Sequence, residues 1–200
     1  MSEQNKVKIL KIARDKGIIR PKDIEAAGIS REYLIQLHKE GRLERAGRGL
    51  YHLPGALMHE SRNLAEVTIR VPHCVICLIS ALSFHGLTTE IPHAVWIAIE
   101  NKRWTPKIDY PPVMTIRMSD AAIGYGVETH FVEKTPIRVF SAPKTIADCF
   151  KYRKQVGIDT AIAALKDGLM PNKCTVTDIW KAAQVCRVAA FMRPYLEALA

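Results

Sequence analysis

The stretch PKDIEAAGISREYLIQLHKEGRLERAGRGLYHLP, residues 21–54, decides the fold of the N-terminal part of the chain. Pro21 suits the first position of a helix, because it has no amide hydrogen to leave unpaired, and the helix that it opens runs to Gly28. Gly28-Ile29-Ser30 predicts a tight turn, and serine is a residue type that caps the start of a helix. A third helix, REYLIQLHKE, therefore follows the turn and ends at Gly41.

Two further patterns flank these helices. Upstream, residues 4–16 carry apolar side chains at helical spacing and predict an amphipathic helix that Gly17 ends. Downstream, two short alternating segments on either side of Gly47-Arg48-Gly49 predict a β-hairpin. Helix, the short apolar pair Ile18-Ile19, helix, turn, helix and hairpin is the element order of a winged helix-turn-helix. We therefore expect this DNA-binding domain over residues 1–56.

The third helix divides into two faces. Tyr33, Leu34 and Leu37 share one face and should pack against the other helices. The opposite face should enter the major groove, where side chains reach base edges and phosphates, and the hairpin arginines should reach the flanking minor groove or the backbone. The candidate DNA-binding residues are Ser30, Arg31, Glu32, Ile35, Gln36, Lys39, Arg45 and Arg48. The alternative is a small helical subdomain whose basic residues form a solvated face.

The charge of the chain agrees with a polyanionic partner. The formal net charge is +9 and the isoelectric point is near 9.4. The first 60 residues hold 12 basic and 8 acidic side chains, against 17 and 12 in the other 140, so the basic excess per residue is higher at the N-terminal end. Charge alone does not distinguish DNA from RNA or an acidic membrane surface.

The remainder, residues 57–200, predicts a second domain. Residues 55–70 favour a connecting helix, and the apolar run at 73–87 favours another that ends at Gly86. Strand patterns follow at 93–100, 112–119, 127–133 and 137–142, with turns at 101–112 and 120–126, and helical patterns occupy 144–155, 158–169, 176–188 and 189–200. The expected fold class is α+β: a winged helix-turn-helix, then an α+β domain with a small mixed sheet and a helical tail.

Residues 21–54 resemble the N-terminal winged-helix domain of AbiEi-type antitoxins, in which a short strand, here Gly49-Leu50-Tyr51, closes the wing. The segment VICLISALSFHGLTTEIPHAVWIAI is similar to the start of the family's C-terminal antitoxin domain. Its matching clusters are Ser80-Ala81-Leu82, His85-Gly86-Leu87 and Ile91-Pro92. SAPKTIADCFKYR resembles a later segment of that domain through Pro143, Thr145 and Asp148, although Lys144 stands where the family often has arginine.

The resemblance implies a transcriptional autorepressor that binds inverted repeats upstream of its own two-gene operon. It also implies an antitoxin of a type IV, abortive-infection toxin–antitoxin system that neutralises a nucleotidyltransferase-like toxin without a tight complex. On this interpretation the chain is not an enzyme and needs no cofactor. Its partners are operator DNA and the toxin.

Two other functions stay open. A sensor-type repressor would bind a small molecule in a closed apolar pocket with convergent polar groups. A DNA-targeted nuclease would bring carboxylates such as Asp109, Asp120, Glu128 and Glu133, with Lys134, around a metal ion. The sequence contains neither a G-x-S-x-G elbow nor a G-x-x-x-x-G-K-[ST] phosphate loop, which disfavours two large enzyme classes.

Three smaller features complete the interpretation. Cys74-x-x-Cys77 lies among apolar neighbours and lacks a second cysteine pair at ligand spacing, so we expect buried thiols and no metal. The basic loop around an aromatic ring, Lys102, Arg103, Trp104 and Lys107, has a composition suited to a second nucleic-acid surface, whereas Trp96 should lie in the core. Five cysteines, no export signal and no long apolar run indicate a cytoplasmic location away from the membrane.

Overall fold

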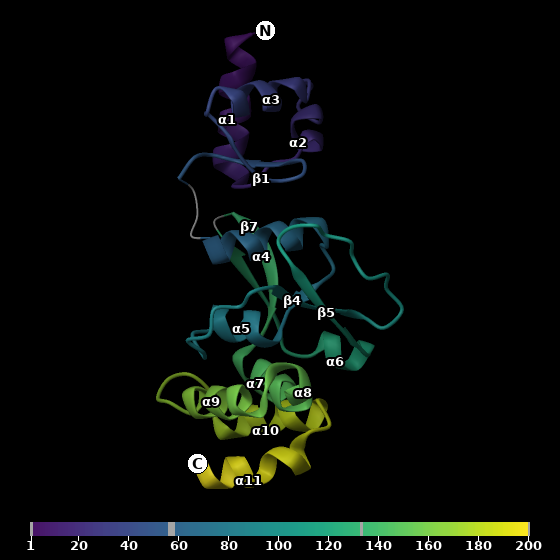
Figure 1. Ribbon diagram of the computed structural model, residues 1–200, viewed down its shortest axis with the longest axis vertical. Coiled ribbons are helices and arrows are strands. Elements are labelled where there is room, and N and C mark those ends of the chain that lie inside the picture. The colour runs from purple at the N-terminus through teal and green to yellow at the C-terminus, as the bar shows by residue number, and fades with distance from the viewer. Residues whose placement is uncertain (1, 56–58, 133, 200) are drawn as a thin grey trace. The chain divides into compact units, whose positions relative to one another are not determined.

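The computed structural model describes residues 2–55, 59–132 and 134–199 and contains two compact units (Figure 1). The N-terminal unit comprises the chain up to Arg70 together with Phe131–Ile137, and the C-terminal unit comprises Val71–His130 and Arg138 onward. The boundary expected between residues 56 and 57 falls outside the described residues.

The N-terminal unit follows the predicted element order. Its elements are α1 (Glu3–Lys16), α2 (Pro21–Glu25), α3 (Glu32–Lys39), β1 (Glu44–Gly47), β2 (Leu50–His52) and α4 (His59–Arg70). Gly17 ends α1 as expected, with a φ of 75° and its amide donating to the carbonyl of Ala13 at 2.9 Å. Pro21 opens α2, where the Asp23 carboxylate accepts the Arg20 amide at 2.8 Å and satisfies a free donor of the first turn. The helices and hairpin of a winged helix-turn-helix are thus present.

One core holds these elements together. Ile9 of α1, Ile24 of α2 and Leu34 and Leu37 of α3 are fully or almost fully buried. Ile19 joins them and pairs with Tyr51 of β2 through an isolated antiparallel bridge. The wing is therefore hydrogen-bonded to the segment between α1 and α2, which links it to the helical core.

A mixed five-stranded sheet follows, as the α+β prediction requires. Its strands are β3 (Val75–Ile76), β4 (Val95–Glu100), β5 (Val113–Met118), β6 (Val127–Val132) and β7 (Thr135–Phe140), in the order β5-β4-β3-β7-β6. β3 runs antiparallel to β4, whereas β4 with β5 and β3 with β7 are parallel pairs. The inner strand β4 is buried from Val95 to Ile99, which explains the apolar run VWIAI before Glu100.

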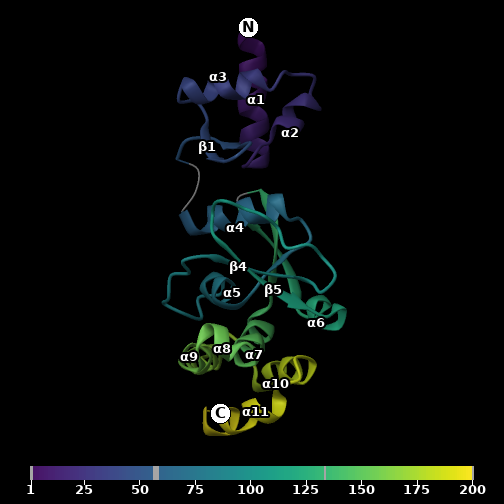
Figure 2. The ribbon, with the colours of Figure 1, turned by 45° about the vertical axis from the view of Figure 1, so that its right-hand side comes forward.

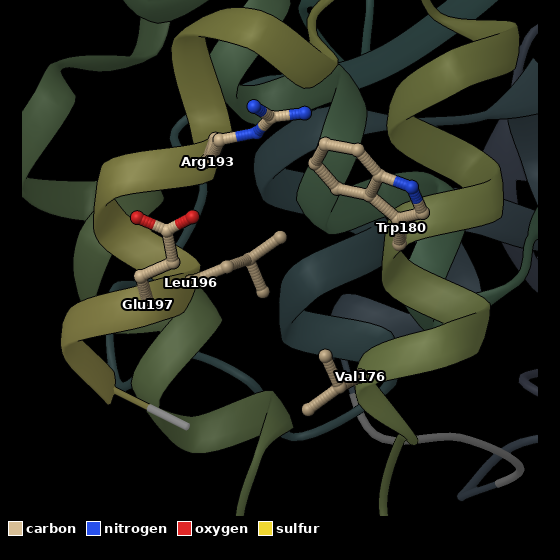
Figure 3. Close-up of a pocket in the computed structure, with 5 residues that line it drawn as sticks. All are labelled: Val176, Trp180, Arg193, Leu196 and Glu197. Atoms are coloured by element: carbon tan, nitrogen blue, oxygen red, sulfur yellow. The ribbon is translucent and has the colours of Figure 1, made fainter.

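Helices cover this sheet and form a layer of their own. They are α5 (Leu78–Phe84), α6 (Asp120–Gly124), α7 (Ala142–Lys151), α8 (Arg153–Val156), α9 (Ile158–Gly168), α10 (Val176–Val185) and α11 (Ala189–Leu199). Figures 1 and 2 show α7–α11 gathered where β7 leads into α7. α7 contacts α5, α9, α10 and α11 and so is central to the layer. Between α10 and α11 lies a groove lined by Val176, Trp180, Arg193, Leu196 and Glu197 (Figure 3).

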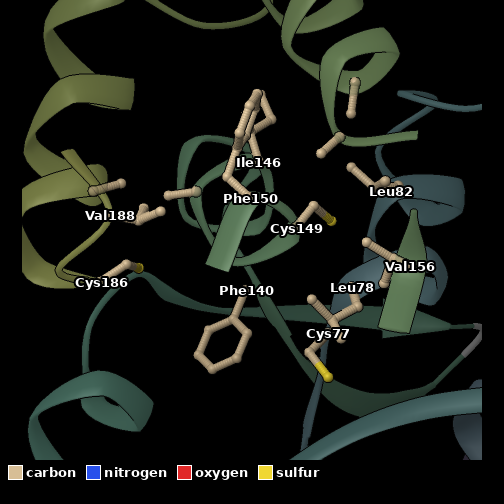
Figure 4. Packing of buried hydrophobic residues seen from close by; sticks show 14 of the residues in the cluster. Cys77, Leu78, Leu82, Phe140, Ile146, Cys149, Phe150, Val156, Cys186 and Val188 are labelled. Carbon is tan, nitrogen blue, oxygen red and sulfur yellow. The ribbon is translucent and has the colours of Figure 1, made fainter. Parts of the chain in front are cut away.

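The core of the C-terminal unit is built around α7 and its neighbours (Figure 4). Phe140, Ile146 and Phe150 are fully buried there, with the thiols of Cys77 and Cys149 among them. Burial raises the pKa of both thiols well above its usual value. These cysteines are protonated side chains that fill the core, which agrees with the prediction of buried structural thiols.

A charged pair is buried in the same core. Lys144 and Asp148, one turn apart on α7, are 0% and 1% exposed, and the Lys144 ammonium donates to the Asp148 carboxylate. The other carboxylate oxygen accepts from the Cys186 thiol at 3.2 Å, and the ammonium lies 4.3 Å from the centre of the Phe140 ring. Both charges are therefore compensated inside the protein, as buried charges must be.

The clusters that resemble the antitoxin domain are structural in this chain. The Ser80 hydroxyl accepts the amide of Trp96 at 2.9 Å and ties α5 to β4. A ring nitrogen of His85 lies 2.7 Å from the Phe140 carbonyl oxygen. The amide of buried Leu87 donates a hydrogen bond to the carbonyl of Leu82 at the C-terminal end of α5. Ser80 and His85 thus join α5 to strands β4 and β7, whereas Ile91 of the third cluster is 75% exposed.

The structure corrects three local predictions. Residues 73–77 do not begin a helix: Val75 and Ile76 form β3, and α5 starts only at Leu78. The turn predicted at 120–126 contains α6, and the single helix predicted at 144–155 breaks at Tyr152 into α7 and α8. In the connecting helix predicted at 55–70, residues 56–58 lie outside the described part and the remainder is α4.

Candidate nucleic-acid interface

The third helix, α3, is held so that one face stays exposed. Tyr33, Leu34 and Leu37 are buried, as predicted, and fix the helix on the core. At its C-terminal end Glu40 accepts a hydrogen bond from Lys6 of α1 at 2.5 Å. That bond is the main cause lowering the pKa of Glu40, and it joins the two helices at their surface.

The outward face of α3 contains most of the predicted contact residues. Arg31, Glu32 and Lys39 are exposed, and Ile35 is 50% exposed although it is apolar. Ser30 precedes the helix, and its hydroxyl accepts the amide of Glu32 at 3.4 Å. An exposed isoleucine between two cations is well suited to a thymine methyl group beside phosphates.

Gln36 differs from these residues because it has an intramolecular partner. Its side chain is half buried, and its Nε2 donates to Glu40 at 2.9 Å. Its Oε1 is buried and has no hydrogen-bond partner. A bidentate adenine contact from Gln36 would require its buried Oε1 to become accessible, whereas Arg31 and Lys39 are already exposed.

The wing presents a single arginine at its turn. β1 and β2 pair antiparallel, with Glu44 opposite His52 and Arg45 opposite Tyr51. The Arg45 guanidinium donates to the carbonyl of Gly47 at 3.2 Å and so lies along the wing. Arg48 is exposed in the turn, next to Gly49, which takes a φ of 71°. Arg48 is therefore better placed than Arg45 to contact a ligand.

A carboxylate beneath the wing was not predicted from the sequence. Glu66 of α4 is fully buried and pairs with Arg70 at 2.7 Å. Burial raises the pKa of Glu66, although Arg70 and Arg62 act to lower it. A side chain on Gly47 would collide with Glu66 and Arg70, so glycine lets β1 approach α4 closely. The sequence pattern placed Gly47 in the turn, whereas the structure places it at the end of β1, so this contact had no signal in the sequence.

The predicted second surface lies on the loop between β4 and β5. The Arg117 guanidinium donates to the carbonyls of Asn101 (2.7 Å) and Arg103 (2.6 Å) and to the hydroxyl of Thr105 (3.0 Å). These three bonds hold the loop while Trp104 remains 94% exposed. Lys102, Arg103 and Lys107 are exposed around it, with Arg103 paired to Glu100. Trp96, in contrast, is buried in β4 as expected.

The features required by the nuclease alternative do not assemble. Across residues 2–55, 59–132 and 134–199, no three histidine, cysteine, aspartate or glutamate side chains converge to hold a metal ion. Asp109 and Asp120 are exposed, and Glu128 bonds to His130 at 3.0 Å. Glu133 lies outside the described residues. In the part of the chain that the structure describes, no helix is long and apolar enough to cross a membrane.

Comparisons with known proteins agree with this architecture. Residues 7–54 match the model of a family described as "Transcriptional regulator, AbiEi antitoxin". The crystal structure of the Rv2827c protein from Mycobacterium tuberculosis aligns with a TM-score of 0.61 at 12% identity, covering 100% of this chain and 83% of that chain. At that identity the likeness shows the fold alone, and no curated protein sequence matches the chain. The family match ends at Pro54, where the wing ends. At its N-terminus the chain is therefore similar, over residues 7–54, to the AbiEi antitoxin family of transcriptional regulators.

Proposed function

We propose that the chain is a cytoplasmic, sequence-specific autorepressor that also acts as the antitoxin of a type IV toxin–antitoxin pair. The observation that carries the proposal is the match of residues 7–54 to AbiEi regulators, on a domain whose α3 and wing turn leave cations exposed. In this role α3 reads the major groove of inverted repeats upstream of its own operon, and Arg48 follows the neighbouring backbone or minor groove. The chain performs no catalysis in this role.

The contacts on α3 have separate tasks in this proposal. Arg31 is the residue for guanine and Ile35 for a thymine methyl group, while Lys39 neutralises a phosphate. Ser30 and Glu32 lie at the N-terminus of α3, where the helix dipole favours a phosphate. Gln36 has the weakest claim, because Glu40 already holds its amide.

The second part of the proposal assigns toxin neutralisation to the C-terminal unit. The nucleotidyltransferase-like toxin is a functional partner here without a tight complex. We include the loop with Lys102, Arg103, Trp104 and Lys107 as a second nucleic-acid surface, because an exposed indole among cations can stack on an unpaired base. The hydrogen bonds from Arg117 to the carbonyls of Asn101 and Arg103 support this role, because a loop that is already ordered loses little conformational entropy on binding.

A full-length variant with Arg31→Ala, Ile35→Ala and Arg48→Ala tests the division of labour. All three side chains are exposed, so the variant should fold. It should lose binding to the upstream DNA in a gel-shift titration and derepress a promoter reporter. It should still protect cells when it is co-expressed with the neighbouring toxin-like protein.

A second set of measurements separates the parts of the proposal. Wild-type affinity should fall steeply with salt, because several cations displace counterions, and a flat response would contradict the proposed phosphate contacts. Trp104→Ala should leave operator repression intact while weakening binding to single-stranded nucleic acid. A triple variant that represses like the wild type would show that α3 and the wing do not bind the operator.

A further inference from the structure

The groove between α10 and α11 has the size and lining of a small-molecule site. Its volume is about 360 Å³, within the range of ligand pockets, and most of its surface is apolar. Figure 3 shows Val176 and Leu196 directed between the two helices, with the Trp180 ring beside them. Leu196 is buried and forms part of the core, whereas Val176 is 42% exposed at the mouth.

Two opposite charges lie at this groove without forming a pair. Arg193 and Glu197 are one turn apart on α11, a spacing that ordinarily favours an ion pair. In the described structure neither side chain forms a salt bridge, with the other or with a third residue. The Arg193 guanidinium instead lies over Trp180, 5.5 Å from the ring centre. A cation–π contact of this kind is electrostatic and does not require the N–H donors of the guanidinium to form a hydrogen bond.

We propose that this groove binds a free amino acid with an apolar or aromatic side chain. The ligand's carboxylate accepts two hydrogen bonds from Arg193, the geometry for which a guanidinium is best suited. Its ammonium donates to the Glu197 carboxylate, and its side chain lies against Trp180, Val176 and Leu196. The three features of the groove thus correspond to the three parts of one zwitterion.

Charge complementarity favours this occupant over others. A simple acid would place its carboxylate near the like charge of Glu197, which would then have no partner. A simple amine would place its ammonium near the like charge of Arg193, which would then have no partner. Nucleic acid is disfavoured for the same reason as the acid, and a helix of wholly apolar character would desolvate both charges without compensation. The inference goes beyond the proposed function, because it gives the helical layer a metabolite ligand independent of DNA and toxin.

Calorimetric titration of the full-length protein tests the proposal with L-leucine and L-phenylalanine as probes. Both should bind saturably. 3-Phenylpropionate, which lacks the ammonium, and phenethylamine, which lacks the carboxylate, should each bind at least about tenfold more weakly, the factor expected for losing one charged hydrogen bond. Arg193→Gln and Glu197→Gln should each weaken L-phenylalanine binding by a similar factor. Lys181→Gln, an exposed cation on α10, is the matched control and should bind like the wild type.

The competing outcomes are distinct. Absence of saturable heat with either amino acid in the millimolar range, or equal binding of 3-phenylpropionate, overturns the proposal. Sedimentation velocity on the same samples detects whether a second copy of the chain occupies the groove. The amino-acid proposal is also overturned if the protein self-associates, if Glu197→Gln abolishes that self-association, and if no amino acid binds. Circular dichroism shows whether the variants are folded, and both replace exposed side chains outside any ion pair. Since the titration contains neither DNA nor toxin, its failure leaves the proposed regulator function intact, and failure of operator binding leaves this site intact.

Discussion

The two units of the molecule differ in one respect: among the described residues, the C-terminal unit buries a lysine completely, whereas the N-terminal unit keeps its lysines at least partly exposed. In the N-terminal unit Lys39 is exposed on α3, and Lys6 joins Glu40 at the surface. In the C-terminal unit Lys144 is fully buried, and its charge is compensated by Asp148. A count of basic residues treats these side chains alike, although only the exposed ones can meet a polyanion. The comparison shows that the charge of a DNA-binding chain has to be assigned residue by residue.

The same contrast extends to the segments that resemble AbiEi antitoxins. In residues 21–54 the resemblance includes exposed side chains, such as Arg31 and Arg48, that are free to contact a ligand. In the C-terminal unit it rests on Ser80, His85 and Asp148, whose side chains bond to other parts of the core. These three side chains are therefore engaged inside the unit, whereas Ile91 of the same segments and the loop with Trp104 are exposed.

Lys144→Met should have the largest effect on stability. It leaves the Asp148 carboxylate buried without a cation, which typically costs about 3–5 kcal/mol of unfolding free energy. Lys151→Met on the exposed side of the same helix is the matched control and should cost less than about 1 kcal/mol. Urea unfolding followed by circular dichroism measures both. If Lys144→Met does not fold, the double variant with Asp148→Leu should recover folding, because no buried charge remains. Equal losses for the two lysines would show that the burial of Lys144 does not decide its contribution to stability.

Arg31→Ala should lower operator affinity by about 1–3 kcal/mol and relax the preference at one base position. Arg48→Ala should weaken binding to all DNA sequences and reduce the salt dependence, as expected for a backbone contact. Gln36→Ala should have the smaller effect, because its amide is already bonded to Glu40. Gel-shift titrations against operators randomised at single positions measure these differences, with Lys181→Ala as a control of equal charge. A larger loss from Gln36→Ala than from Arg31→Ala would show that Gln36 leaves Glu40 on binding.

Gly47→Ala tests the contact between the wing and α4. The added methyl group displaces the buried Glu66–Arg70 pair, and we expect a loss of about 1–2 kcal/mol, since side-chain ends must move. Operator affinity should fall with it, because β1 carries the wing turn. Gly124→Ala is the control: a methyl group there meets open space, and its effect should stay within about 0.5 kcal/mol. Thermal unfolding and operator titration measure both variants. If Gly47→Ala and Gly124→Ala gave the same results, the predicted contact between the wing and α4 would be contradicted.

Asp23→Asn should give the smallest effect, and one that depends on pH. Burial acts to raise the pKa of Asp23, but the hydrogen bonds from Lys16 and Arg20 outweigh it and hold the pKa below its usual value. A lowered pKa in the folded state contributes stability at neutral pH that is lost as the pH falls through that pKa. The deficit of the variant, less than about 1 kcal/mol, should therefore be present at pH 7 and vanish in strong acid. Asp159→Asn, on the exposed side of α9, should show no comparable dependence in urea unfolding at the two pH values.

Local patterns were sufficient for the N-terminal elements. Gly17, Pro21 and Gly41 act through backbone preferences that need no distant partner, so α1, α2 and α3 appear where the residues predict them. The face of α3 that packs was also predictable, because helical spacing alone places Leu34 and Leu37 together. The exposure of Arg31 and Ile35 follows from the same geometry.

The sequence by itself thus determined the order of elements in the winged helix-turn-helix, the two faces of α3, the α+β class and the approximate positions of β4 to β7. Tertiary contact decided the remainder. Val75 and Ile76 are strand residues because β4 and β7 pair with them, whereas an isolated apolar run is ambiguous between helix and strand. Glu66 and Lys144 are buried because partners in the folded chain compensate their charges, and Gln36 is occupied because Glu40 lies within reach. Residue type and spacing encode local conformation, but burial and pairing depend on side chains that only the fold brings together.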